Sequence, residues 1–250
     1  MTNIIVSGIN GKMGNIVYSC VCNRNDCKAV GGLDITPNDS LPIKLFNSPS
    51  EIDCDVDVII DFSHPSLLPD LLDFACKNKV ALVICTTGYS KQEVESIKKA
   101  SQVIPIFYSG NMSLGINLLI ELSKKARLVF GDSFDVEIIE RHHNLKIDAP
   151  SGTAFMIADA VSSVCDEDMK YIYDRHSVRK RRDKNEIGIH AVRGGTIVGE
   201  HEVLFAGRDE TFSITHRAQS KEVFAVGAVS AAVYLNGKKP GMYNMSDMLS

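Results

Sequence analysis

The chain has 250 residues, of which 44% are hydrophobic and 23% charged, and its formal net charge is −4. This composition is typical of soluble globular enzymes and excludes a disordered chain or a basic nucleic-acid-binding protein. No uninterrupted apolar run approaches the roughly 20 residues that a membrane-spanning helix needs. The amino terminus enters an apolar strand without a basic stretch, so we expect a cytoplasmic protein with no membrane and no nucleic-acid partner.

Seven cysteines are scattered along the chain without a repeated Cys-x-x-Cys unit. An odd number without paired spacing argues against a disulfide framework. The group Cys20, Cys22 and Cys27 lacks the second pair of ligands that a zinc site needs, so no metal is predicted. We therefore expect free thiols.

The first half of the chain alternates short apolar runs with helical segments, which is typical of βαβ units around a parallel sheet. The strands are expected at 4–7, 29–33, 56–61, 80–85 and 103–107, and the helices at 12–23, 67–78, 91–100 and 114–128. By the end of the last of these helices the parallel sheet is expected to be complete.

The pattern then changes to longer strands with one helix after Pro150, which indicates a second domain. These strands are expected at 136–141, 187–193, 200–206 and 211–215, and a closing helix at 222–235 packs back on one of the domains. The predicted fold is α/β, with an N-terminal Rossmann-like parallel sheet and a second α+β domain carrying an open mixed sheet. The domains are assigned as 1–112 with 222–250, and 113–221.

The first strand leads into a turn with three glycines, Gly8, Gly11 and Gly14. Glycine permits a tight turn and lets the backbone approach a pyrophosphate, which the following helix terminus stabilises. Such a spacing alone is weak evidence, because ordinary strand-to-helix turns share it. Asp34, about 20 positions beyond Gly14 and at the end of the second strand, strengthens the prediction of a dinucleotide site.

The residues around Asp34 also bear on cofactor preference. A carboxylate there accepts hydrogen bonds from ribose hydroxyls and repels a 2′-phosphate, and Ile35 follows it rather than an arginine. Lys12 leaves room for a phosphate contact. We therefore expect NADH to serve at least as well as NADPH.

A second helix start is predicted after Pro150, with Ser151 or Thr153 as the capping residue. The first backbone N–H groups of a helix have no partner within it and attract anions. A carboxylate could therefore bind the amides of Gly152 and Thr153.

Two histidines and a lysine precede this helix start. Lys146 supplies a full positive charge, and His142 or His143 could exchange protons near neutral pH. Surface histidines beside a capped helix are the alternative interpretation. The combination favours a site that reduces an acidic substrate.

The stretch from His142 to Ala154, HHNLKIDAPSGTA, resembles the HHxxKxDAPSGTA signature of the dihydrodipicolinate reductase family. Further segments resemble family motifs in the same order, so that the resemblance runs from residue 8 to the C-terminal helix. They are GINGKMG from Gly8, DFSHP from Asp61, CTTGY from Cys85, SGNMSLGIN from Ser109 and RGGTIVGEH from Arg193.

The resemblance implies an oxidoreductase that uses NADH and/or NADPH. Its small-molecule substrate would be a dicarboxylate, 4-hydroxy-tetrahydrodipicolinate, which is reduced to tetrahydrodipicolinate in the diaminopimelate route to lysine. It also implies a homotetramer. Another two-domain nicotinamide dehydrogenase, or a non-catalytic dinucleotide sensor, stays open as an alternative.

The resemblance also implies residue roles. His142 would be the acid/base residue and Lys146 a proton donor, and protonated His142 and Lys146 would stabilise developing negative charge. The substrate-binding residues would be His143, Lys146, Ser151, Gly152 and Thr153. The cofactor-binding residues would be Gly8, Ile9, Asn10, Gly11, Lys12, Met13, Asp34, Cys85, Thr86, Thr87, Ser109, Gly110, Asn111 and Met112.

The sequence departs from the family pattern at two positions of the predicted cofactor site. Cys85 stands where a glycine is usual and Met112 where a phenylalanine is usual, and both are expected to change packing more than chemistry. The basic run at 179–184 is expected to be a solvated surface segment, although it could also attract a dianionic substrate.

Overall fold

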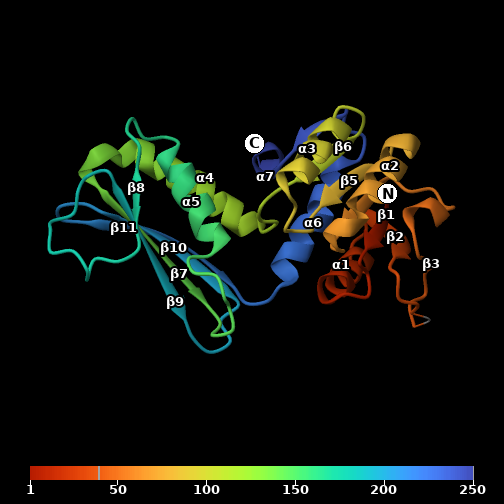
Figure 1. The fold of residues 1–250 in the computed structure, drawn as a ribbon, viewed down its shortest axis with the longest axis horizontal. Helices are drawn as coiled ribbons and strands as arrows, with labels where there is room; N and C mark the ends of the chain where they lie inside the picture. The colour runs from red at the N-terminus through yellow and green to blue at the C-terminus, as the bar shows by residue number, and fades with distance from the viewer. Residues whose placement is uncertain (39, 250) are drawn as a thin grey trace. The chain divides into compact units, whose positions relative to one another are not determined.

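The computed structural model describes residues 1–38 and 40–249. The chain packs as two compact units, Met1–Ser113 with Glu222–Ser250, and Leu114–Lys221 (Figure 1). The first break lies one residue beyond the boundary predicted at 112. The assignment of cofactor binding to one unit and substrate binding to the other stays a prediction.

The first unit contains a seven-stranded sheet in the order β12-β6-β5-β4-β1-β2-β3, in which every pair of neighbours is parallel. The order from β3 to β6 is that of dinucleotide-binding folds, with a change of winding direction between β1 and β4. The Rossmann-like prediction is therefore confirmed. The strands are β1 (Thr2–Ser7), β2 (Cys27–Leu33), β3 (Leu45–Phe46), β4 (Val58–Asp61), β5 (Ala81–Ile84), β6 (Pro105–Tyr108) and β12 (Gly241–Tyr243).

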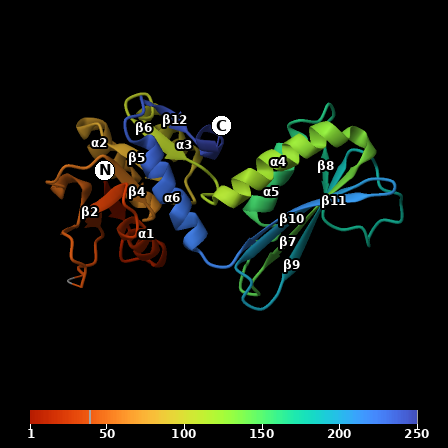
Figure 2. The same ribbon diagram turned by 180° about the vertical axis from the view of Figure 1, so that it is seen from behind.

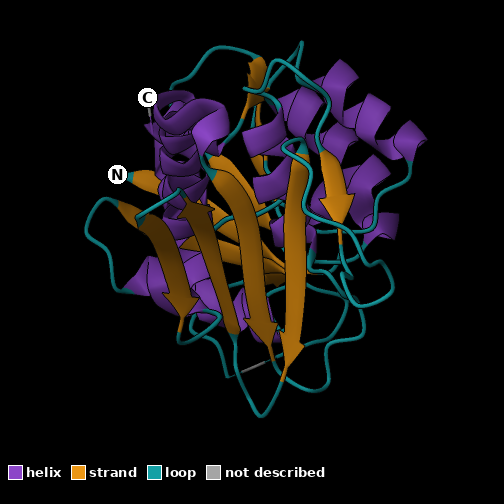
Figure 3. Cartoon of the chain, turned by 90° about the vertical axis from the view of Figure 1, so that its left-hand side faces the viewer, coloured by secondary structure: helices purple, strands orange, loops and turns teal. Residues whose placement is uncertain are grey.

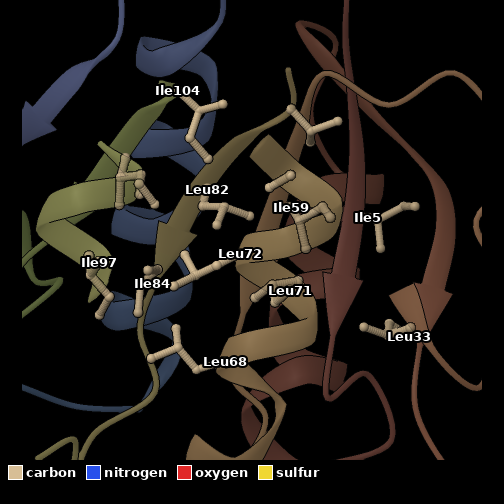
Figure 4. Close-up of a cluster of buried hydrophobic side chains, with 14 of the residues drawn as sticks. Ile5, Leu33, Ile59, Leu68, Leu71, Leu72, Leu82, Ile84, Ile97 and Ile104 are labelled. Atoms are coloured by element: carbon tan, nitrogen blue, oxygen red, sulfur yellow. The ribbon is translucent and has the colours of Figure 1, made fainter. Parts of the chain in front are cut away.

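Helices pack on this sheet through apolar side chains. Helix α1 (Lys12–Cys22) contacts α6 (Glu222–Leu235), and α6 also contacts β4, β5 and β6. Helices α2 (Leu68–Asn78) and α3 (Lys91–Ala100) contribute to a buried aliphatic cluster with β1, β4 and β5 (Figure 4). This core holds the strand ends in fixed positions.

The expectation that the parallel sheet is complete before the second domain is wrong. The sheet gains β12 from the C-terminal segment, which pairs parallel with β6. A three-residue strand directly after Pro240 is too short to show a period of two in the sequence. It is followed by α7 (Met245–Leu249), and the short 3-10 turns are η1 (Pro49–Glu51), η2 (Pro65–Leu67) and η3 (Gly131–Ser133).

The second unit contains a five-stranded sheet in the order β11-β10-β7-β9-β8. Strand β10 is antiparallel to β7 and β11, whereas β9 is parallel to β7 and β8, so the predicted open mixed sheet is confirmed. Figure 3 shows the long strands side by side. They are β7 (Asp135–His142), β8 (Lys170–Ile172), β9 (Glu186–Arg193), β10 (Gly199–Ala206) and β11 (Thr211–Ala218).

Helices α4 (Leu114–Phe130) and α5 (Gly152–Ser162) lie together on one face of this sheet (Figure 2). On β7 the residues that face them alternate with residues on the other face. The inward set begins with the buried Val136 and Ile138 and continues with Glu140 and His142. The strand therefore carries a carboxylate into the interior of the unit.

Two further expectations can be compared with the structure. All seven cysteines are free thiols, as predicted. Among the residues that the structure describes, none of the helices has both the length and the apolar character required to cross a membrane.

Candidate active site

The glycine-rich turn of the first unit has the backbone geometry that close approach of a ligand requires. Gly8 has φ +74°, and a Cβ there would come within 2.6 Å of the carbonyl oxygen of Phe62. A Cβ on Gly14 would come within 2.0 Å of the Gly8 carbonyl oxygen, so only glycine lets α1 pack this closely against the turn. Gly11 precedes α1 and offers no side-chain cap to its first N–H groups. The turn therefore fits a bound pyrophosphate.

A cavity of about 540 Å³ lies beside this turn, within the first unit. Gly8, Gly11 and Asp34 contribute to its wall, as does Ile35, whose side chain is exposed. The carboxylate of Asp34 accepts hydrogen bonds from the backbone N–H of Asn10 at 3.0 Å and of Thr36 at 3.0 Å. The acidic residue is therefore fixed at the cavity wall.

The remaining residues of the glycine-rich turn differ in how exposed their side chains are to a ligand. Ile9 is fully buried in the core, so its side chain is not available to a ligand. Lys12 is exposed at the start of α1, and Asn10 and Met13 are partly buried. The N–H groups and Lys12 are thus the accessible polar groups here.

The remaining predicted cofactor residues follow β5 and β6. Because the strands are parallel, their carboxyl ends lie at the same edge of the sheet as the glycine-rich turn. Thr87 and Gly110 are exposed, and Ser109 and Asn111 are partly buried and hydrogen-bonded within their own turn.

Three side chains in these loops are wholly or partly buried. Thr86 is buried and donates to the buried carboxylate of Asp61 at 2.7 Å. Met112 is buried as well. Burial raises the pKa of the Cys85 thiol, and the nearby Asp61 carboxylate raises it further, so that the thiol stays protonated at neutral pH. Thr86, Cys85 and Met112 therefore shape the loops rather than present charge to a ligand.

In the second unit, the buried Glu140 carboxylate accepts four hydrogen bonds. Its Oε2 accepts from His142 Nδ1 at 2.6 Å and Arg193 Nη1 at 2.7 Å. Its Oε1 accepts from Arg193 Nη2 at 2.7 Å and the backbone N–H of Ser151 at 3.0 Å. Glu140, His142, Arg193 and Ser151, together with His201, which contacts Ser151, form what we term the inner cluster.

The electrostatics of the inner cluster set its charge state. Burial opposes ionisation of Glu140, but hydrogen bonds and charges from Arg193 and His142 outweigh it and lower its pKa. Burial also lowers the pKa of His142, and the charges of Lys146 and Arg193 add to this, against the opposing effect of Glu140. These directions leave Glu140 ionised and His142 neutral at neutral pH in the unliganded protein.

His201 lies opposite Glu140 on the neighbouring strand and supports the start of α5. Its Nε2 is 3.0 Å from the Ser151 hydroxyl, which accepts from the backbone N–H of Ala154 at 3.1 Å and so caps the helix. Burial lowers the pKa of His201 to about 3, so the ring is neutral at neutral pH. Of the two predicted caps, Ser151 is the one used.

The other predicted substrate residues lie around this helix start. Nδ1 of His143 is buried and has no hydrogen-bond partner among the described residues. Nζ of Lys146 pairs with Asp148 at 2.8 Å. Gly152 is exposed with open space beside its Cα, and Thr153 is the next residue of α5. The predicted acid/base and carboxylate-binding residues are thus brought together in one unit.

The opposite face of β7 carries a cluster of similar composition. Glu137 accepts from His190 Nε2 at 2.7 Å, Arg175 at 3.0 Å and Arg182 at 3.1 Å. Burial opposes ionisation of Glu137, but the hydrogen bonds of His190 and Arg182 outweigh it and lower its pKa. We refer to Glu137, His190, Arg175 and Arg182 as the outer cluster.

The basic run at 179–184, which was expected to be solvated but could also attract the substrate, contributes to the outer cluster through Arg182. In this basic run, Arg182 forms ion pairs with Glu137 and with Asp135, the latter at 2.8 Å. Lys180 forms an ion pair with Glu186 at 2.9 Å. At least two of its five cations are therefore engaged in ion pairs inside the second unit.

The sequence prediction left without a role the residues that hold these side chains in place, which are Asp61 in the first unit and Glu140, Arg193 and His201 in the second. A signal for Glu140 was present, because it continues an alternation of inward residues and must be partnered if buried. Nothing in the sequence indicated that its partners would be His142 and Arg193.

Comparison with known proteins covers the whole chain. Family profiles described as dihydrodipicolinate reductase, N-terminus and C-terminus, match residues 2–112 and 115–249. The chain belongs to the dihydrodipicolinate reductase family. Relatives named 4-hydroxy-tetrahydrodipicolinate reductase include one from Caldanaerobacter subterraneus subsp. tengcongensis, 48% identical over 251 residues that cover 100% of this chain and 98% of that one. Another, from Clostridium novyi, is 44% identical over 249 residues with the same coverage.

A solved dihydrodipicolinate reductase from a Paenisporosarcina species, described as dipicolinate-bound, has the same fold. It superposes with a TM-score of 0.83 over 100% of both chains at 23% identity. At this identity the likeness establishes the fold alone.

Proposed function

We propose that this chain catalyses the reduction of 4-hydroxy-tetrahydrodipicolinate to tetrahydrodipicolinate with NADH or NADPH, in the diaminopimelate route to lysine. The observation that carries the proposal is the inner cluster, which joins a histidine able to exchange protons to a helix start able to bind a carboxylate. Full-length relatives bear the name of this activity. We place the enzyme in the cytoplasm.

The first unit has the features that a dinucleotide requires. The glycine-rich turn would hold the pyrophosphate, Asp34 the adenosine ribose, and the loops that carry Thr87 and Gly110 the nicotinamide end. When bound, NADH or NADPH supplies a hydride. Because Asp34 is followed by Ile35, the enzyme uses NADH at least as well as NADPH.

The second unit would hold the substrate through its carboxylates. Gly152 and Thr153 present the amino-terminal backbone of α5 to one carboxylate, and His143, with its unpartnered Nδ1, contacts the substrate as well. Lys146 exchanges its ion pair with Asp148 for one with the substrate. Rigid placement of the carboxylates orients the ring for reduction.

His142 and Lys146 handle the proton and the developing charge. Loss of the 4-hydroxyl group as water gives a conjugated imine. Transfer of a hydride to this imine leaves a ring carbon that must take up a proton, which Lys146 donates. The nearby anionic substrate raises the pKa of His142, since negative charge favours the imidazolium form. His142 can then stabilise negative charge and exchange a proton through Nε2.

We also propose a homotetramer assembled through the sheet of the second unit. The support is β11, an eight-residue edge strand whose exposed backbone groups can pair with another copy. Sedimentation equilibrium would show a single species of four chains, and a stable monomer would contradict this.

A coupled assay tests the proposed activity. The preceding synthase makes the substrate from pyruvate and aspartate semialdehyde, and the oxidation of NADH and NADPH is followed separately. Rapid oxidation that depends on fresh substrate, with pyridine-2,6-dicarboxylate as a competitive inhibitor, is the expected result. Binding of NADH without any oxidation would contradict the proposal and would favour a dinucleotide sensor.

A further inference from the structure

Glu140 contacts both functional parts of the proposed substrate site. One carboxylate oxygen accepts from the imidazole of His142, and the other accepts from the backbone N–H of Ser151, the capping residue of α5. Arg193 bridges the two oxygens with two hydrogen bonds of 2.7 Å. The acid/base group and the carboxylate-binding turn are therefore fixed to the same side chain.

The carboxylate dictates which nitrogen of His142 carries hydrogen. An ionised carboxylate can only accept, so Nδ1 must donate, and in the neutral ring Nε2 keeps its lone pair. Nε2 has no hydrogen-bond partner among the described residues. A Cβ on Gly199 would come within 3.1 Å of Nε2, so any larger residue at this position would crowd this nitrogen.

We propose that Glu140 is the positioning residue of this active site: it holds His142 in the Nδ1–H tautomer with Nε2 free for the substrate, and it fixes the first turn of α5. This inference rests on the proposed function for the meaning of the site. It adds a role that neither the family motifs nor the substrate contacts assign.

The neighbouring charges explain how a carboxylate can orient His142 without keeping it protonated. The groups that face the imidazole are Glu140, Arg193 on β9, Lys146 in the following loop, and the ring of His201 on β10 at a centroid distance of 5.3 Å. Arg193 balances the charge of Glu140, and Lys146 adds a positive charge. The ring therefore stays neutral until an anionic substrate arrives.

The variant Glu140→Gln removes this function, because Glu140 is the acceptor in all four of its hydrogen bonds in the native site. Either orientation of the amide places its NH₂ group against an N–H of Arg193, and against His142 or Ser151 as well. Turnover should fall on the order of 10²-fold, within the range for lost acid/base catalysis, and the KM for the dicarboxylate should rise. The affinity for NADH should not change.

The pH profile separates positioning from simple loss of structure. Without the negative charge of Glu140, Lys146 and Arg193 act unopposed, so the pKa of His142 falls and the limb of the profile that His142 controls moves to lower pH. Glu137→Gln is the matched control, because it makes the same change on the same strand but on the other face. It should leave the profile in place, and an equal displacement in both variants would overturn the proposal.

The decisive test uses the unmodified chain, so it holds even if Glu140→Gln fails to fold. ¹⁵N NMR of labelled imidazoles, with His142 assigned from the loss of its signals in His142→Gln, reports which nitrogen is protonated at neutral pH. We expect hydrogen on Nδ1 and a bare Nε2. Hydrogen on Nε2 would overturn the proposal. The measurement needs no substrate, so its outcome is independent of the coupled assay that tests the function.

Discussion

The two faces of β7 carry glutamates with the same kinds of partner in different surroundings. In the inner cluster the Glu140 side chain is 0% exposed and that of His142 11%. In the outer cluster the corresponding values are 18% for Glu137 and 43% for His190. The two clusters thus share a Glu–His–Arg combination but differ in burial. Burial, together with an adjacent helix start, distinguishes the inner cluster.

The clusters also differ in their freedom to rearrange. The outer Glu137 accepts from Arg175 and Arg182 through Oε1, and its Oε2 accepts from His190. A glutamine there could donate to His190, whose ring can change tautomer. In the inner cluster Arg193 donates to both oxygens of Glu140. A glutamine there would leave at least one Arg193 N–H without an acceptor, whichever tautomer His142 adopts.

The largest difference is expected in catalysis. His142→Gln should lower kcat by about 10²- to 10⁴-fold, the contribution of a positioned acid/base group. His190→Gln, which removes the equivalent ring from the outer cluster, should leave kcat unchanged. NADH affinity, measured by fluorescence titration, should stay the same in both variants. A parallel loss of NADH binding in His142→Gln would refute the assigned role.

The second difference is expected in stability. Glu140→Gln removes an ionised acceptor whose side chain is 0% exposed and leaves Arg193, which is 19% exposed, without its counter-charge, which costs on the order of 3 kcal/mol of unfolding free energy. Glu137→Gln should cost less than about 1 kcal/mol, because Glu137 itself is 18% exposed and two of its partners, His190 and Arg175, are 43% and 37% exposed. Urea denaturation of the two variants measures this. Equal losses would show that burial does not distinguish the clusters.

The last effect is expected in the dependence of stability on pH. The pKa of His201 is lowered from 6.5 to about 3 by burial, so the unfolded chain binds more protons between these values. Stability should therefore fall as pH drops below 6.5, by up to about 1.4 kcal/mol per pH unit from this group. His201→Gln, which can still bond Ser151, should flatten the decline above pH 4.5, where the lowered carboxyl groups Glu137 and Glu140 do not yet protonate. An undiminished slope would contradict this assignment.

Much of the fold follows from local sequence pattern. The strand alternation and the glycine-rich turn predicted both sheets and the start of α1, because they depend on neighbouring residues. Strands β3, β8 and β12 were missed because two or three residues are too few to show a period. The substrate residues His142 to Thr153 share one continuous stretch, so sequence could group them.

The supporting residues of the site could not be found in this way. Arg193 reaches Glu140 because β7 and β9 pair in parallel, with His142 opposite Arg193. His201 reaches Ser151 because the pairing of β10 with β7 places it opposite Glu140. These contacts join residues about 50 positions apart and depend on strand order and register. A single sequence read in order contains no signal for them.

The central claim is that the inner cluster, and not the outer one, binds the dicarboxylate. The most direct test titrates the unmodified, imidazole-labelled chain with pyridine-2,6-dicarboxylate and follows His142, His143 and His190 by NMR. We predict saturable shifts at His142 and His143 with no change at His190. Binding that perturbs His190 and leaves His142 and His143 unaffected would contradict the account.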